Sequence, residues 1–167
     1  MSEDRSFYAP ESVGEIVQLL RRRGDVIYAG GGTYLLDRLE GGDSRLGSSH
    51  PKDAPIVSLH RVEELQNIAR SERFAEIGSA AVVQRVLGVG RKFLPPMLIG
   101  ALRQAGPFLI RNTSTVGGNL AIPTHVFGFQ LVLQLLDARL EVRGPKGAEW
   151  LGAARLRESE GRLNLGA

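Results

Sequence analysis

The sequence contains no cysteine, and its 167 residues include only three lysines against 18 arginines. The absence of cysteine excludes a disulfide scaffold, a cysteine-ligated zinc site and an iron–sulfur cluster held by this chain. No run of about 18 apolar residues occurs, and the charged start MSEDRSFYAP lacks the apolar stretch of a secretory signal. We therefore expect no signal peptide and no membrane span, and we expect a cytoplasmic protein.

The formal net charge of +3 does not predict nucleic-acid binding. The arginines are scattered, and the densest run, Arg21 to Arg23, lies at the end of an expected helix, where cations suit the helix dipole. The three histidines, His50, His60 and His125, have no neighbours at metal-ligand spacing. We therefore expect neither a nucleic-acid partner nor a metal site.

Hydrophobic periodicity predicts a mixed α and β chain. A helix is predicted over 11–23, because Ser12 and Glu15 have the spacing of a capping box and Gly24 follows as a stop. The segments DVIYAGGG, PIVSLH and RFAEIGSAAVV are expected to form strands, and MLIGALRQAG and FGFQLVLQLLDA to form helices. RLEVRGPKG is read as a strand and turn, whereas the stretch from Gly152 onward shows no sheet partner.

Two glycine clusters, YAGGGTYLLD (28–37) and IRNTSTVGGNLA (110–121), are both expected to be loops that lead into apolar helices. Such loops let backbone N–H groups approach a phosphate, and the following helix N-terminus adds positive potential. Two of them suit a pyrophosphate, although each cluster by itself also fits a plain turn that needs positive φ. Hydroxyl donors beside these amides would come from Thr33, Thr113, Ser114 and Thr115.

The known phosphate and nucleophile motifs are absent. The sequence has no G-x-x-x-x-G-K-[ST] loop, no G-x-G-x-x-G fingerprint and no G-x-S-x-G elbow. Any chemistry is therefore expected to be carried by a cofactor.

The order of these motifs resembles the FAD-binding subunit or domain of the molybdenum hydroxylases, the xanthine dehydrogenase and carbon monoxide dehydrogenase group. The resemblance runs from about Phe7 to Gly144 and begins with FYAPESVGEIVQLL. EIGSAAV is similar to the family's I-G-A-x-x-T segment, and IRNTSTVGGNLA to its I-R-N-x-x-T-x-G-G-N-[IL]-A signature. The family's A-G-G-T-x-L loop is matched by Gly30, Gly31, Gly32, Thr33, Tyr34 and Leu35.

The resemblance implies an α+β fold, the two-lobed FAD-binding domain of the vanillyl-alcohol-oxidase (PCMH) type. The implied lobes are residues 1–55 and 56–150, with FAD between them, and 151–167 form a tail. The first loop would hold FAD together with a second set of residues: Arg111, Asn112, Thr115, Gly117, Gly118 and Asn119.

The resemblance also implies a flavin-dependent oxidoreductase subunit that does not act alone. In such enzymes FAD takes electrons from iron–sulfur clusters, reduced at a molybdenum centre, and passes them to NAD, a quinone or oxygen. The implied partners are a molybdopterin-binding large subunit and a 2Fe–2S small subunit.

Three departures from the family pattern keep an alternative open. The usual A-S-P-x-x-D acid is missing from Pro123 to Gly128, Tyr34 replaces a smaller residue, and the family's C-terminal domain is not recognised beyond about Gly144. That domain is then a separate chain, or this sequence is a fragment of a longer one, or the protein has lost the domain. A separate chain carrying that domain, or a homo-oligomer, would cover the cofactor. The alternative is a degenerate structural or assembly subunit that binds FAD weakly or not at all. A third possibility is a generic α/β module for another diphosphate ligand.

Overall fold

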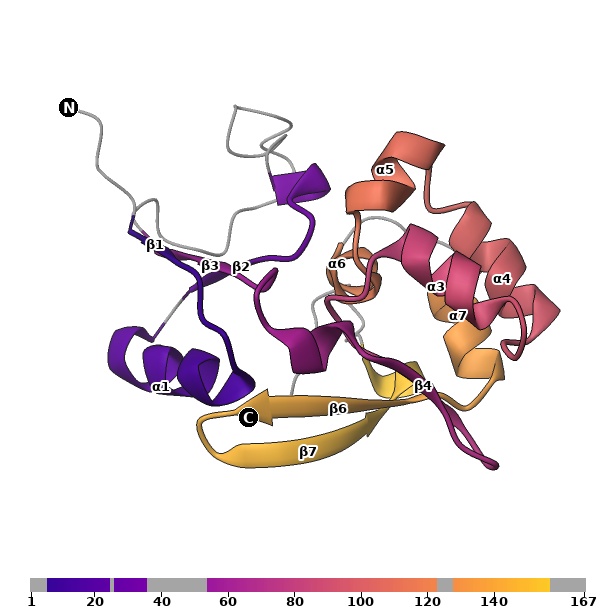
Figure 1. The fold of residues 1–167 in the computed structure, drawn as a ribbon. Coiled ribbons are helices and arrows are strands. Elements are labelled where there is room, and N and C mark those ends of the chain that lie inside the picture. The colour runs from indigo at the N-terminus through magenta and orange to yellow at the C-terminus, as the bar shows by residue number, and fades with distance from the viewer. Residues whose placement is uncertain (1–5, 25, 36–53, 123–127, 157–167) are drawn as a thin grey trace.

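The computed structural model describes residues 6–24, 26–35, 54–122 and 128–156. Within these ranges the strands form one three-stranded sheet and two hairpins, and most of the helices gather on one side of the molecule (Figure 1). The strands are β1 (Phe7–Tyr8), β2 (Ile27–Ala29), β3 (Ile56–Ser58), β4 (Ile68–Arg70), β5 (Ala75–Ile77), β6 (Arg139–Gly144) and β7 (Gly147–Gly152). The helices are α1 (Val13–Arg23), α3 (Val83–Gly90), α4 (Pro96–Arg103), α5 (Phe108–Thr113), α6 (Val116–Ala121) and α7 (Gly128–Leu135), with the 3-10 turns η2 (Glu63–Gln66) and η3 (Ala153–Arg155).

The helix α1 has the ends that the sequence predicts. The Ser12 side chain accepts a hydrogen bond from the backbone N–H of Glu15 at 3.2 Å. The Glu15 carboxylate accepts from the N–H of Glu11 at 3.0 Å, one residue before the donor of a standard capping box. At the other end Gly24 has φ of 73° and donates its N–H to the Leu20 carbonyl.

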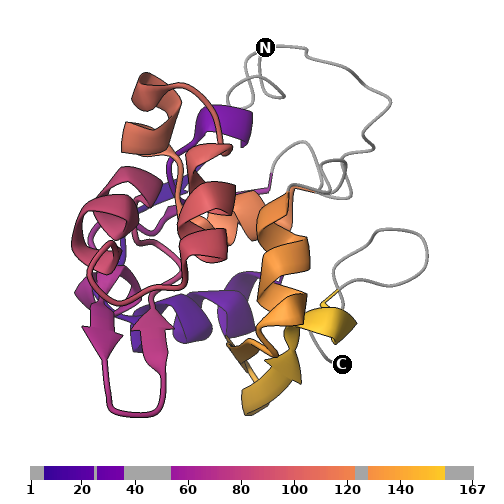
Figure 2. The same ribbon diagram turned by 90° about the vertical axis from the view of Figure 1, so that its right-hand side faces the viewer.

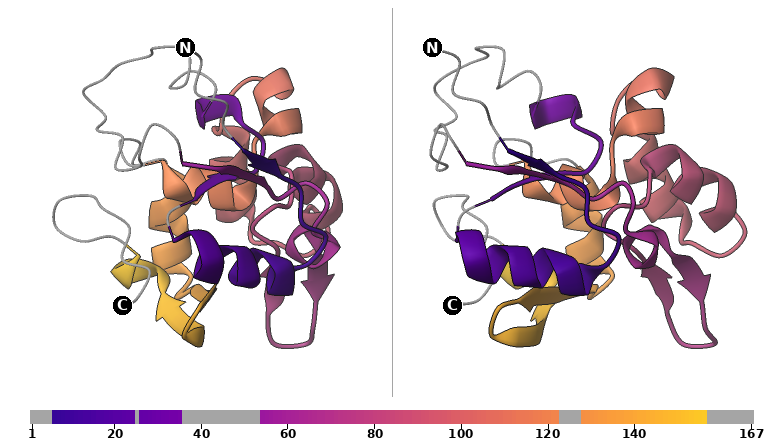
Figure 3. Two further views of the ribbon diagram at one scale, coloured as in Figure 1. Left: turned by 90° about the vertical axis from the view of Figure 1, so that its left-hand side faces the viewer. Right: turned by 60° about the vertical axis from the view of Figure 1, so that its left-hand side comes forward.

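The sheet β1-β3-β2 is parallel throughout and places β3 between the other two strands. Figure 3 shows α1 along one face of this sheet. The small core between them contains Val13, Ile16, Val26, Val57 and Val62. Because β3 supplies Val57, this core includes residues on both sides of position 55; the division of the chain into lobes at that position stays a prediction.

A second and larger core lies among the helices. Its largest fully buried side chains, Val83, Val86 and Leu102, come from α3 and α4. The buried Phe129 belongs to α7, and Leu156, which follows η3, packs into the same cluster. The residues around η3 therefore form part of the fold.

The hairpin β6–β7 connects the two cores, lying below both in Figure 1. Arg21 at the end of α1 donates to the carbonyl of Pro145 at 2.8 Å, and Arg143 on β6 lies 3.5 Å from the Glu64 carboxylate. Sequence reasoning missed β7, because Gly147–Gly152 has no alternating pattern: its first four residues are exposed and its last two are half-buried. No helix in the described ranges has both the length and the apolar character needed to cross a membrane.

Two local predictions were wrong. The segment IRNTSTVGGNLA was expected to be a loop, but α5 and α6 take up most of it. RFAEIGSAAVV was expected to be a strand, but within it only Ala75–Ile77 forms a strand, in the short hairpin β4–β5 that projects from the helices in Figure 2. The strand ends there because Gly78 packs closely on the carbonyl of Leu65, which also accepts the N–H of Ala80 at 2.8 Å.

Candidate functional site

The first glycine cluster follows β2 at the carboxyl edge of the parallel sheet. The residues Gly30 to Gly32 form a bend, and a helix begins at Thr33. This helix lies on the side of the sheet away from α1 (Figure 3). Gly32 has φ of 71°, a conformation that favours glycine. The carboxyl edge of a parallel sheet is where open α/β folds bind their ligands.

The two glycine-containing segments pack directly against each other. A β-carbon on Gly30 would collide with the Thr115 hydroxyl, and one on Gly31 would overlap the backbone carbonyl of Thr113. The absence of side chains at these two positions is therefore explained by close backbone approach. The two clusters are therefore in direct contact, whereas their joint action on a ligand stays a prediction.

The first turn of α6 uses its own amide groups within the chain. Thr115 is the N-cap residue, and its Oγ1 accepts the N–H of Gly118 at 3.1 Å. The N–H of Val116 donates to the Ala81 carbonyl at 3.0 Å, and the N–H of Gly117 donates to Ser79 at 2.7 Å. A phosphate could receive these three hydrogen bonds only if the packing of α6 were broken.

The adjacent glycines of α6 face different surroundings. A β-carbon on Gly117 would lie 2.8 Å from the Ser79 β-carbon and 2.9 Å from its carbonyl oxygen. Gly118 is exposed, and a β-carbon there would meet only the Thr115 hydroxyl, at 2.9 Å. Of the two, Gly118 is thus the one whose β-carbon would meet a side chain and no backbone of another segment.

The polar residues around the second glycine cluster have mixed surroundings. Arg111 donates to the carbonyl of Gly106 at 2.6 Å and to the Gln84 side chain at 3.1 Å, which ties α5 to α3. Asn119 is buried and donates its side-chain N–H to the Thr115 carbonyl at 2.8 Å. Asn112 is exposed on α5. Arg111 and Asn119 therefore support the local fold, whereas Asn112 is accessible to a ligand.

Uncommitted hydrogen-bonding groups gather at the first glycine cluster. In the described part of the chain, no hydrogen bond uses the amide N–H groups of Gly31, Gly32 or Thr33. Ser114, against which Gly31 packs, is 5% exposed, and its hydroxyl has no hydrogen-bond partner among the described residues. A buried hydroxyl without a partner is costly. Three amides at a helix start, with a hydroxyl nearby, fit a phosphate-bearing ligand.

The remaining predicted residues of the first cluster, Tyr34 and Leu35, are half-buried and lie in the helix that begins at Thr33. The region of the missing acid, 123–127, lies outside the described residues. In the ranges that the structure describes, no group of three His, Cys, Asp or Glu residues is placed to hold a metal ion.

Sequence reasoning missed the segment that supports α6. Ser79 and Ala81 accept the first two amides of the helix, and Val82 forms an isolated bridge with Thr115. The sequence shows a glycine, Gly78, within EIGSAAV, but not that its β-carbon would collide with the Leu65 backbone. Close packing of that kind cannot be read from the sequence.

Comparison with known proteins gives one family. A family model described as "FAD binding domain in molybdopterin dehydrogenase" matches residues 3–166. The chain is 25% identical over 168 aligned residues to the xanthine dehydrogenase FAD-binding subunit of Escherichia coli O157:H7, an alignment that covers 99% of this chain and 55% of the relative. A putative xanthine dehydrogenase FAD-binding subunit of Escherichia coli K12 matches equally. The chain thus spans about half the length of these curated relatives.

Solved structures give the same fold. Carbon monoxide dehydrogenase from Hydrogenophaga pseudoflava superposes with a TM-score of 0.84 at 22% identity, covering 99% of this chain and 56% of that chain. Quinoline 2-oxidoreductase from Pseudomonas putida 86 superposes with a TM-score of 0.82 at 24% identity, covering 98% and 55%. The predicted α+β fold is thereby confirmed.

Proposed function

The chain belongs to the FAD binding domains of molybdopterin dehydrogenases, and from this premise we propose that it is the FAD-binding electron-transfer part of a xanthine or carbon monoxide dehydrogenase-like complex. The family agrees with the predicted cofactor. The choice of residues that hold FAD, the electron route and the partner subunits are parts of the proposal.

The first glycine cluster holds the diphosphate in this proposal. The amides of Gly31, Gly32 and Thr33 point to a ligand because no described residue accepts from them, and the Thr33 helix start adds positive potential. The Ser114 hydroxyl donates to the cofactor and so gains the partner that it lacks within the described chain. These donors are the single observation that carries the proposal.

The second glycine cluster has two tasks in this proposal. Thr115, Gly117 and Asn119 hold α6 against the first cluster, so that the donors there keep their positions. Gly118 and Asn112 are exposed and form the surface that the cofactor approaches. Tyr34 and Leu35 belong to the adjacent helix, and Arg111 keeps α5 in place.

Bound FAD would supply the redox chemistry, and this chain would position it and limit its access to water. We propose that electrons arrive from a 2Fe–2S small subunit, reduced by a molybdopterin-binding large subunit, and leave to a separate acceptor. The chain spans about half the length of its relatives, and we propose that a further domain completes the cover over the cofactor.

A second candidate function has one observation in its favour. All three amides of the first turn of α6 are already bonded inside the chain, so this part of the site is stable without a ligand. A structural or assembly subunit of the same fold that binds FAD weakly would keep this packing.

An absorbance titration separates the two candidates. We expect stoichiometric FAD binding and a bound-flavin absorbance band. The absorbance of that band should decrease as the flavin is reduced, when the native complex is given its electron donor. Folded protein that binds no FAD, alone or in its complex, would favour the structural subunit. Preferential binding of a different dinucleotide would instead indicate another diphosphate ligand.

A further inference from the structure

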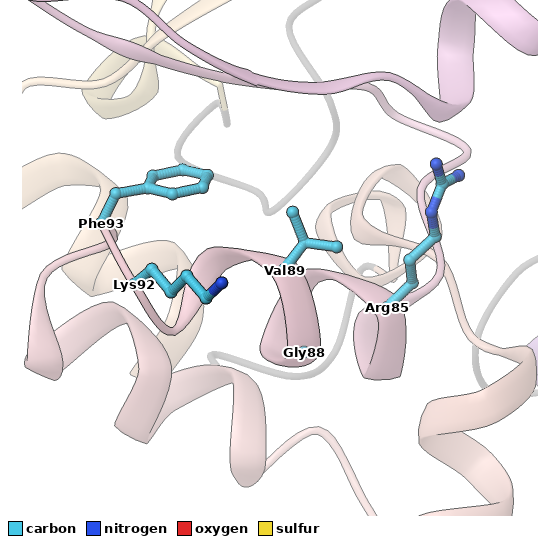
Figure 4. A pocket seen from close by; sticks show the side chains of 5 residues that line it. All are labelled: Arg85, Gly88, Val89, Lys92 and Phe93. Carbon is cyan, nitrogen blue, oxygen red and sulfur yellow. The ribbon is translucent and has the colours of Figure 1, made fainter.

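The outer face of α3 carries a hollow with a basic rim, away from the glycine clusters. The hollow has a volume of about 580 Å³ and is lined by Arg85, Gly88, Val89, Lys92 and Phe93. Figure 4 shows Arg85 at one end and Phe93 at the other, with Val89 between them and Lys92 beside it. Gly88 forms the floor: nothing in the described chain lies within 4 Å of where its β-carbon would be.

The cations around this hollow lack acidic partners. Arg70 on β4 adds a third positive charge, with its Cζ atom 6.0 Å from the centre of the Phe93 ring. In the described ranges the ion pairs involve Arg61 and Arg143, and none involves Arg70, Arg85 or Lys92. Pairing within the hairpin places Glu76 beside Ala69, on the face opposite to Arg70. The rim therefore has unbalanced positive charge.

The centre of the hollow is apolar and partly uncovered. Val89, which lines the hollow, is 45% exposed. The lining residues come from one helix and the turn that follows it, so the hollow is open to one side. A small ligand needs walls that enclose most of its surface, which this hollow does not provide. An apolar centre with arginine and an aromatic ring, surrounded by charge, is instead typical of a protein interface.

We propose that this hollow, bounded by Arg70, Arg85 and Lys92, docks an acidic segment of another subunit of the complex. The segment places an apolar side chain over Gly88 and Val89 and carboxylates against Arg85 and Lys92. Arg85 lies on α3 and Lys92 in the turn that follows it, so the partner needs at least two separate carboxylates, one for each cation. The identity of the partner as a subunit rests on the proposed function.

The test uses the complex purified from cells that make the tagged chain. A carbodiimide reagent joins a lysine amine to a carboxylate in direct contact, and the chain has only Lys52, Lys92 and Lys146 to react. We expect mass spectrometry to find Lys92 joined to an Asp or Glu of a different polypeptide. A cross-link from Lys92 only to this chain's own sequence would overturn the proposal, as would the absence of any Lys92 cross-link.

Amino-acid substitutions test the same contact without a cross-linking reagent. Arg85→Glu combined with Lys92→Glu should weaken association with the partner at least tenfold, and Gly88→Gln should weaken it by filling the hollow. The matched control, Arg139→Glu with Arg155→Glu, changes the charge equally at exposed positions elsewhere and should assemble normally. Equal assembly of both double variants would overturn the proposal. If the chain bound ADP or pyrophosphate and Arg85→Glu abolished this binding, the hollow would be a small-ligand site, and the proposal would also be overturned.

The FAD absorbance of each variant separates this inference from the proposed function. We expect the charge-reversed chain to keep its flavin and lose its partner. A wild-type chain that assembles through Lys92 but carries no flavin would refute the proposed electron-transfer role alone.

Discussion

The backbone of Gly31 lies directly against the carbonyl of Thr113, with no room for a β-carbon between them. This contact joins the end of β2 to the end of α5, and so fixes the first glycine cluster against the second. The donors proposed to hold the FAD diphosphate therefore depend on a contact between segments that are distant in sequence.

Replacing Gly31 with alanine should destabilise the fold. The new β-carbon would overlap backbone atoms, which cannot move aside as a side chain can. The free energy of unfolding should therefore fall by an amount at the upper end of about 1–3 kcal/mol. Urea unfolding of the cofactor-free protein measures it. Gly100→Ala is the control, since nothing lies within 4 Å of that position on α4 and a helical glycine costs about 0.5–1 kcal/mol relative to alanine. If both variants were equally stable, the close approach of Gly31 would be refuted.

The neighbouring glycines of α6 should respond differently to alanine. Gly117→Ala meets the Ser79 backbone and should lower stability by about 1–3 kcal/mol. In Gly118→Ala the methyl group would lie 2.9 Å from the Thr115 hydroxyl, a side-chain atom that has to shift, so the fold should survive with a smaller loss of stability. FAD affinity should fall at least tenfold, because the methyl group occupies the surface that the cofactor approaches. Thermal unfolding and FAD titration of both variants distinguish the two effects. An unchanged FAD affinity in folded Gly118→Ala protein would remove Gly118 from the proposed site.

The buried hydroxyl of Ser114 offers a test in both states of the protein. Ser114→Ala removes a polar atom that has no partner in the described chain, so the cofactor-free protein should become more stable by about 1 kcal/mol. FAD affinity should fall about tenfold, which corresponds to the lower end of the free-energy range for a hydrogen bond to a charged group. A gain in stability without a loss of affinity would show that the hydroxyl does not contact FAD.

Arg111 should matter for stability more than for the cofactor. Arg111→Met removes the hydrogen bonds to Gln84 and to the Gly106 carbonyl and leaves these acceptors partly unsatisfied, so a loss of about 1–3 kcal/mol is expected. FAD affinity of the folded fraction should stay within about threefold of wild type, since the guanidinium is directed at α3 and the turn before α5. Chemical unfolding and flavin titration on the same samples provide both values. A large loss of affinity at full stability would assign Arg111 to the cofactor instead.

Local interactions made several elements predictable from the sequence. Ser12, Glu15 and Gly24 set both ends of α1 through contacts within a few residues, and these held in the structure. Runs of apolar residues similarly located β2, β3 and α7. The glycine motifs occur along the chain in the same order as in the family, and so they identified the family and its cofactor. A motif can be recognised from residue types and spacing even when the packing of these residues is unknown.

Tertiary contacts decided what the glycines do. Gly117 and Gly118 read as a loop because glycine disfavours helices, yet Thr115 caps α6, and carbonyls of Ser79 and Ala81 hold its first turn. The strand β7 formed because β6 offered a partner, not because Gly147–Gly152 has a strand pattern. The sequence thus determined local structure, family and cofactor. Only the folded chain determined which amides remain for a ligand, since hydrogen bonds between distant segments use up the others.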